Sequence, residues 1–207
     1  MKKLMFFFVL LVNILNAQSF LIEKGRTAIS VEAGFLQNDP SDANAFAFTV
    51  KTKNDVFFSL AISDSKVDFP EAGRRKASGV GLTLAGLRRW DSGKRHILFS
   101  ILPSIGYQKI NVPGYGTSKT LTVHFSFFRE LLQNNQFYLT PDLNGGFLFN
   151  IGDVNQGSYP FLGLGFSVAM RLFKISILHF SYSHEKLFVN DTAVKNDLLG
   201  FGLSFGI

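Results

Sequence analysis

Alternation of apolar with small or polar residues recurs along almost the whole chain and limits its possible folds more than any other feature. Between Thr27 and Phe35, for example, Ile29 and Val31 alternate with Ser30 and Glu32. A period of two places successive side chains on opposite faces of a β-strand. The same pattern recurs in residues 46–50, 56–62, 80–85, 97–107, 120–127, 137–147, 162–170, 173–183 and 199–207. We therefore predict an all-β chain of about ten strands.

The first residues have the three parts of a secretory signal peptide. Lys2 and Lys3 precede an apolar run that continues to Leu15 and is followed by Asn16, Ala17 and Gln18. The apolar run is shorter than the ~18–20 residues that a helix needs to cross a bilayer. We predict that residues 1–17 are a signal peptide, that 18–25 are a periplasmic N-terminal lead and that 26–207 form the barrel.

Composition excludes several classes of protein. The chain has no cysteine, so disulfides and cysteine metal sites are absent. Its net charge of +6 becomes +4 when Lys2 and Lys3 are removed, which is too weak to indicate nucleic-acid binding. Hydrophobic residues make up 46% of the chain, with 24 Phe and 19 Gly, yet no later apolar run is long enough for a membrane helix. We expect Phe to face lipid and Gly to face a narrow lumen.

The links between the predicted strands alternate between short and longer, as the turns and loops of membrane barrels do. The short links are residues 52–54, 91–94, 133–135 and 171–172, and the longer ones are residues 37–42, 64–76, 108–118, 150–157 and 184–196. An open sheet edge in lipid would leave backbone groups unpaired, so the sheet must close. We predict a transmembrane antiparallel up-and-down β-barrel with both chain ends in the periplasm. Asp64, Asp68, Glu71 and Glu185 then become solvated loop charges.

The final strand carries an apolar ladder at alternate positions: Leu199, Phe201, Leu203, Phe205 and Ile207. This ladder is similar to the C-terminal assembly signal of outer-membrane β-barrels, although that family usually ends in an aromatic residue. Residues 26–207 resemble the small outer-membrane barrels of the Bacteroidota type. The resemblance implies a place in the cell outer membrane, contact with outer-membrane lipids and lipopolysaccharide, and recognition by the outer-membrane assembly machinery. It leaves open whether other membrane-protein subunits bind.

A soluble barrel or sandwich in the periplasm is the alternative to a membrane barrel. Its apolar faces would point inward, and its outward faces would carry charged residues along the strands. In this chain the face opposite the apolar one holds mainly small residues, and most charges fall in the predicted links. The pattern favours the membrane barrel.

A His-x-Ser pair occurs twice, as His124 with Ser126 and as His179 with Ser181. Two residues apart on a strand, imidazole and hydroxyl share a face and can act as base and nucleophile. The second pair resembles the site of the outer-membrane lipid A deacylases. That resemblance implies His179 as base, Ser181 as nucleophile and Asp191 or Asp197 as the orienting acid, although Tyr182 replaces the usual Asn and the family's acid is usually Glu.

The simpler interpretation places the polar residues in a hydrogen-bonded network that fills the lumen, because buried polar groups need partners. The network would comprise Glu32, His124, Ser126, Asp142, Asn144, His179 and Ser181. A second predicted site is the basic run Arg74, Arg75 and Lys76, which either binds lipopolysaccharide phosphate or is an ordinary solvated loop. The sequence has no metal-binding or cofactor-binding motif.

These observations predict a non-enzymatic outer-membrane barrel with a structural, binding or complex-forming role. Lipid A ester hydrolysis by His179 and Ser181 is one alternative, and a small passive channel is another.

Overall fold

The computed structural model describes residues 25–38, 41–69, 73–91, 97–114, 116–129, 132–133, 136–151, 157–189 and 192–207. Strands dominate it, in the order β1 (Ala28–Asn38), β2 (Ser41–Lys51), β3 (Val56–Phe69), β4 (Gly73–Gly86), β5 (Arg88–Asp91), β6 (Ile97–Val112), β7 (Gly116–Phe128), β8 (Leu132–Gln133), β9 (Phe137–Asn150), β10 (Gly157–Phe173), β11 (Ser176–Val189) and β12 (Thr192–Gly206). Among these described residues, no helix is long and apolar enough to cross a membrane. The predicted signal peptide, residues 1–17, and most of the lead, residues 18–24, lie outside the described residues.

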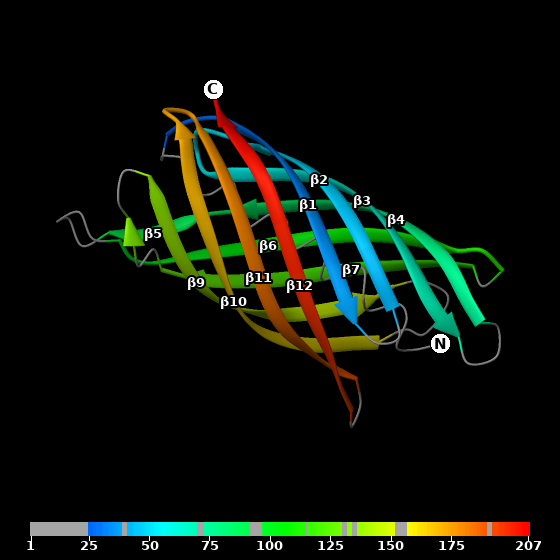
Figure 1. The fold of residues 1–207 in the computed structure, drawn as a ribbon. Helices are drawn as coiled ribbons and strands as arrows, with labels where there is room; N and C mark the ends of the chain where they lie inside the picture. The colour runs from blue at the N-terminus through cyan, green and yellow to red at the C-terminus, as the bar shows by residue number, and fades with distance from the viewer. Residues whose placement is uncertain are drawn as a thin grey trace.

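The sheet closes on itself through a seam between the first and last strands (Figure 1). Every pairing around the ring is antiparallel. The seam runs from Ala28 opposite Gly206 to Gln37 opposite Asp197, and the Ile207 amide donates to the Thr27 carbonyl at 2.8 Å. The structure thus confirms the predicted closed antiparallel barrel.

Two of the twelve labelled strands are short continuations of their predecessors. β5 pairs with β6 beyond the end of β4, and β8 pairs with β9 beyond the end of β7. The wall therefore consists of ten barrel strands, two of which are interrupted. Both interruptions lie near the end of the barrel that carries Ala28 and Gly206, called here the terminal end; the opposite end is called the distal end.

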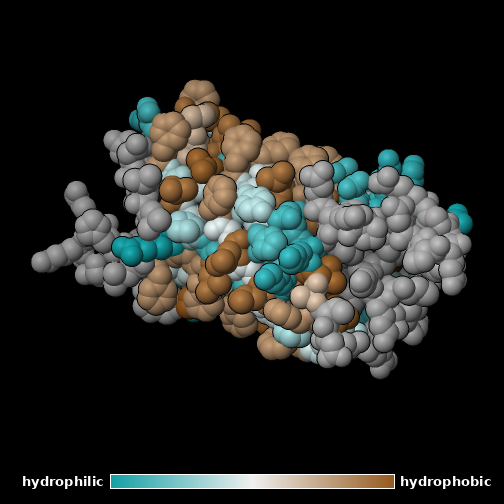
Figure 2. All heavy atoms as spheres, turned by 60° about the horizontal axis from the view of Figure 1, so that its bottom comes forward, coloured by the Kyte–Doolittle hydropathy of each residue, from teal (hydrophilic) through white to brown (hydrophobic). Residues whose placement is uncertain are grey.

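Alternate side chains separate as the sequence pattern predicts. The outward positions form a belt of exposed apolar side chains around the barrel, and brown side chains cover much of the wall in Figure 2. Belt members include Val31, Phe46, Phe48, Leu60, Ile62, Leu82, Phe125, Leu143, Phe147, Leu162, Leu164, Phe166, Phe180, Leu199, Phe201 and Phe205. The inward positions are buried and hold mostly small residues, which suits the narrow interior of a ten-stranded wall.

The distal strand ends differ from the prediction. The sequence predicts loops at residues 64–76, 108–118 and 184–196, but most of the described part of each segment is paired strand. β3 extends to Phe69 and β11 extends to Val189, well beyond the apolar belt. The backbone continues its ladder there because cross-strand hydrogen bonds need no apolar side chains.

Two apolar clusters fill the interior near its two ends. The cluster at the terminal end contains Ala28, Phe57, Ala85, Leu87, Leu102, Phe128, Tyr138, Ala169 and Ile177. The cluster at the distal end contains Leu148, Tyr159, Phe161, Leu187 and Val189, with Val194 packed against it. The polar side chains described below lie between the two clusters.

A buried ion pair fixes the terminal end. Lys51 is fully buried at the end of β2; its ammonium lies 2.7 Å from Asp55 Oδ1 and donates to the Arg26 carbonyl at 3.0 Å. Asp55 adopts a φ of 57° in the turn, and its carbonyl accepts the Leu87 amide at 2.9 Å. These contacts join the start of the described chain, the β2–β3 turn and the end of β4.

Candidate functional site

Glu32 and His179 lean toward each other inside the barrel across a glycine. Glu32 on β1 and His179 on β11 both lie opposite Gly202 on β12, and all three side-chain positions face the lumen. A Cβ on Gly202 would lie 2.7 Å from Glu32 Cγ and still closer to His179 Nε2. Glycine is therefore required here for the two larger side chains to approach. Ser30 Oγ donates to Glu32 Oε1 at 2.9 Å.

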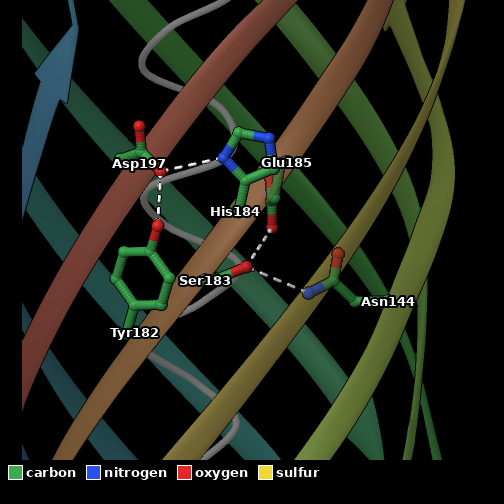
Figure 3. Close-up of polar contacts among 6 residues, drawn as sticks. All are labelled: Asn144, Tyr182, Ser183, His184, Glu185 and Asp197. Carbon is green, nitrogen blue, oxygen red and sulfur yellow. Dashed lines mark hydrogen bonds and ion pairs between the residues drawn. The ribbon is translucent and has the colours of Figure 1, made fainter.

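A second polar group crosses β10 at another glycine (Figure 3). Asn144 Nδ2 donates to Ser183 Oγ at 3.2 Å, and Ser183 Oγ donates to Glu185 Oε1 at 3.3 Å. The same amide group donates to Asp142 Oδ2 at 3.1 Å. Gly163 lies between Asn144 and Glu185 in the register, and a Cβ there would be 2.6 Å from Glu185 Cγ. The hydrogen-bond chain thus links β9 to β11 over the small residue of β10.

His124 is held between two serines in a third group. Its Nε2 lies 3.3 Å from Ser126 Oγ, and its Nδ1 lies 3.3 Å from Ser104 Oγ on β6. Phe161 stacks on the imidazole with ring centroids 5.6 Å apart. Contacts on both nitrogens and on one ring face hold the imidazole in a single orientation.

All seven residues predicted for the lumen do lie on the lumen side of their strands. Six of them fall into three separate groups, however, and not one continuous network, and Ser181 belongs to none of the three. His179 and Ser181 illustrate the difference: neither His179 nitrogen nor Ser181 Oγ has a hydrogen-bond partner among the described residues. The arrangement does not couple them as base and nucleophile.

Only one of the two candidate orienting acids, Asp197, lies within the described residues. Asp191 lies outside the described residues. Asp197 lies on the outer face of β12, whereas His179 faces the lumen. The partners of Asp197 are instead on the outside of the barrel.

Tyr182, His184 and Asp197 form an external cluster on β11 and β12 (Figure 3). The Tyr182 hydroxyl donates to Asp197 Oδ1 at 2.6 Å, and His184 Nδ1 contacts the same oxygen at 2.8 Å. The side chains of His184 and Asp197 are 39% and 49% exposed, so solvent or headgroups reach them. The cluster lies at the distal edge of the apolar belt on these strands. Tyr182 is opposite Leu199, which belongs to the belt, and His184 is opposite Asp197, one step nearer the distal end.

Four further residues belong to these hydrogen-bonded groups and are not among the seven predicted: Ser30, Ser104, Ser183 and Glu185. The prediction that Glu185 is a solvated loop charge is wrong, since the residue is fully buried on β11. Its position four residues after Ser181 was the available signal, because it has the same strand parity. Asp64 is exposed as expected, and the side chains of Asp68 and Glu71 lie outside the described residues.

The basic run at the start of β4 does not form one patch. Arg75 and Lys76 are both exposed, but successive residues of a strand point to opposite faces. Lys76 points outward and lies opposite Lys66, whereas Arg75 follows the inward parity of Ala77. The side chain of Arg74 lies outside the described residues. The three residues are therefore not gathered on one surface.

No group of three or more His, Asp or Glu residues within the described ranges could hold a metal ion. The polar groups of the lumen offer hydrogen-bonding atoms, but each group has at most two carboxylates.

Comparison with known proteins places the fold and nothing finer. No protein-family model and no curated protein matches the chain. Among solved structures, the translocator domain of the autotransporter NalP from Neisseria meningitidis is similar, with 10% identity and a TM-score of 0.51 over 95% of this chain and 92% of that one. The transport unit of the autotransporter AIDA-I from Escherichia coli is also similar, with 8% identity and a TM-score of 0.50 over 95% of this chain and 96% of that one. The chain has the fold of an outer-membrane β-barrel.

Proposed function

We propose that the protein is an outer-membrane β-barrel with a closed lumen, acting as a non-enzymatic structural or binding component of that membrane. One observation carries the proposal: most of the described inward side chains are buried, from the terminal end toward the distal end. The cluster around Phe57 and Tyr138 fills the terminal end, the cluster around Phe161 and Leu187 fills part of the distal end, and polar groups occupy the space between. A lumen of this kind stiffens the wall and leaves no wide path for a solute.

The placement in the outer membrane is supported by the fold and by the belt of exposed apolar residues. A wall with Phe and Leu outside and serine and glycine inside is stable only when lipid covers the outside. The proposal includes export by the signal peptide, a Gram-negative and Bacteroidota-type host, and delivery by the assembly machinery through the apolar ladder of β12. Lipids and lipopolysaccharide then surround the belt, and the terminal end faces the periplasm.

Lipid A hydrolysis is the less favoured alternative. A deacylase must bring its nucleophile to a lipid outside the wall, whereas His179 and Ser181 face the lumen, where His179 is fully buried. Mass spectrometry of lipid A from cells expressing the wild type or Ser181→Ala tests the point directly. We expect identical acyl patterns from the two strains. If lipid A loses an acyl chain with the wild type but not with Ser181→Ala, the deacylase alternative is correct.

The closed lumen is tested by conductance in planar bilayers. We expect no stepwise current from the wild-type barrel, with insertion verified by the heat-dependent mobility shift of folded barrels on gels. A variant with Phe161→Ala and Leu187→Ala, which face each other across β10 and β11, together with Tyr138→Ala, trims both apolar clusters. We expect current steps from this variant, because removing large side chains from a packed interior leaves cavities.

Current steps from the correctly folded wild type would refute the closed lumen and favour the passive channel. If the trimmed variant does not fold, the silent and folded wild type still decides the question.

A further inference from the structure

Two lysines face each other on the outer surface of β6 and β7. Lys109 and Lys119 are directly opposite in the register, and both are exposed on the outward face. Like charges at directly opposite positions of an antiparallel pair destabilise the sheet. A pair of this kind is therefore stabilised by an anion that binds between the two ammonium groups.

The described residues around this lysine pair carry no compensating carboxylate. Val80 lies beside Lys109 on β4, and the Ile151 amide donates to the Lys119 carbonyl at 3.0 Å on the other side. Along the strands, the next outward pairs are Asn111 with Thr117 on one side and Tyr107 with Leu121 on the other. Within the described part of the wall, the register thus gives the two lysines uncharged neighbours.

An apolar groove begins directly below the pair. It has a volume of about 540 Å³ and runs across the outward faces of β2, β3, β4, β6 and β7. Its lining includes Leu60, Leu82, Ile105, Tyr107 and Leu121. Lys109 and Lys119 lie two residues beyond Tyr107 and Leu121, roughly 7 Å along the strands. The groove lies within the belt, where lipid chains would cover it.

We propose that Lys109, Lys119 and this groove form a binding site for one lipid with a net-anionic phosphate headgroup. The phosphate lies between the two ammonium groups and accepts a charge-assisted hydrogen bond from each. One acyl chain follows the groove past Tyr107 and Leu82. The long lysine stems keep their charge at the polar boundary while their methylenes cover apolar wall.

A second lysine pair, Lys66 with Lys76, shows what this site requires. These two are also directly opposite and exposed, but Asp42 lies in the same row and Asp64 in the next. Acidic neighbours offset the two lysines and repel a phosphate. The pair therefore serves as a matched control with the same charge and the same strand geometry.

The inference rests on the proposed place of the barrel in a membrane, and its test is independent of the closed lumen. Mature full-length protein in detergent is mixed with equal amounts of phosphatidylglycerol and phosphatidylcholine that carry the same acyl chains. Native mass spectrometry then counts each lipid on the folded barrel. We expect phosphatidylglycerol to predominate, and K109Q/K119Q to reduce its excess by about fivefold for each lysine.

Control variants separate the charge, the position and the groove. K109R/K119R should keep the preference, since it keeps both charges, and K66Q/K76Q should keep it because the site is elsewhere. Leu121→Trp, which fills the groove, should weaken lipid binding while both lysines remain. An excess of glycerol 3-phosphate should not displace the lipid, since it has no acyl chain to occupy the groove.

Equal occupancy of the wild type by the two lipids would overturn the site. So would a K66Q/K76Q variant that loses as much of the phosphatidylglycerol excess as K109Q/K119Q does, because the preference would then depend on net charge alone. Displacement by glycerol 3-phosphate would overturn the role of the groove. A conducting wild type would refute the closed lumen and leave this lipid site intact.

Discussion

Gly202 is the position where a single methyl group tests the packing of the lumen. In Gly202→Ala the new Cβ would lie 2.7 Å from Glu32 Cγ and 2.8 Å from His179 Cε1. Carbons in ordinary contact are about 3.5–4.0 Å apart, so the methyl group is roughly 0.8 Å too close on two sides. Overpacking lowers the free energy of unfolding by about 1–3 kcal/mol. Because the new methyl group meets a side chain on each side, we expect Gly202→Ala to lower it by about 2–3 kcal/mol.

The assay is urea unfolding of the barrel in detergent micelles or vesicles, followed by the mobility shift of the folded form. Gly86→Ala is the matched control, because a Cβ there would have nothing within 4 Å. We expect Gly86→Ala to leave the free energy of unfolding unchanged or to raise it by up to about 1 kcal/mol, since alanine restricts the unfolded chain more than glycine does.

A double-mutant cycle identifies the cause of the cost. His179→Ala removes the ring that Gly202→Ala would strike, so the double variant should recover about 1–2 kcal/mol relative to the sum of the single changes. Costs that add to within about 0.5 kcal/mol would refute the proposed contact across Gly202.

Three further predictions follow from the wall and its two ends. Lys51→Met should lower the free energy of unfolding in urea by about 3–5 kcal/mol, because it leaves the Asp55 carboxylate buried without its cation. Adding Asp55→Asn should recover much of that loss, and an equal loss in the double variant would contradict this. Leu82→Arg on the belt should lower the stability of the barrel in phospholipid vesicles by about 2–4 kcal/mol, whereas Ser78→Arg, four residues nearer the distal end, should change it little; equal effects would place the belt elsewhere. Asp197→Asn should cost less than about 1 kcal/mol by the same assay, since the cluster that it disrupts is half exposed; a larger loss would mean that lipid shields it.

The strands within the belt could be predicted because one face is apolar and the other is small. Positions such as Phe46, Phe48 and Val50 made the period of two visible, and the register confirmed their shared face. The closed ring of ten strands followed from the number of such segments and from the need to pair every strand edge in lipid.

The distal strand ends could not be predicted in the same way. Beyond the belt, toward the distal end, the outward residues become polar, as at Lys66, Lys109 and Lys186. The inward neighbours of the last two, Ile110 and Leu187, are apolar and buried, so the apolar face of the sequence pattern changes sides. Glu185 was mistaken for loop charge for this reason, although it is fully buried. The sequence pattern alone does not fix the direction of His179, because apolar Ile177 shares its face and could face lipid. The structure places Ile177 inside the barrel, in the apolar cluster of the terminal end.

The sequence predicted which residues of the candidate site face the lumen better than it predicted which of them contact one another. Strand parity placed His124, Asn144 and His179 in the lumen, but it carries no information on which strands are neighbours in the ring. The bond between Asn144 and Ser183 joins residues 39 positions apart across β10, and the pairing of Asp197 with His184 depends on the register of β11 and β12. Such contacts depend on tertiary geometry.

The seam between β1 and β12 also sets the order in which the molecule can assemble. It pairs Ala28 with Gly206, 178 positions later (206 − 28), whereas most other neighbours in the ring are successive hairpin strands. Closing a loop of that length costs about 5 kcal/mol of chain entropy, more than any local hairpin requires. We therefore expect the hairpins to form first and ring closure to be the late and slow event. Until then β1 and β12 are two free edges, so any factor that bound either edge would control when the barrel closes.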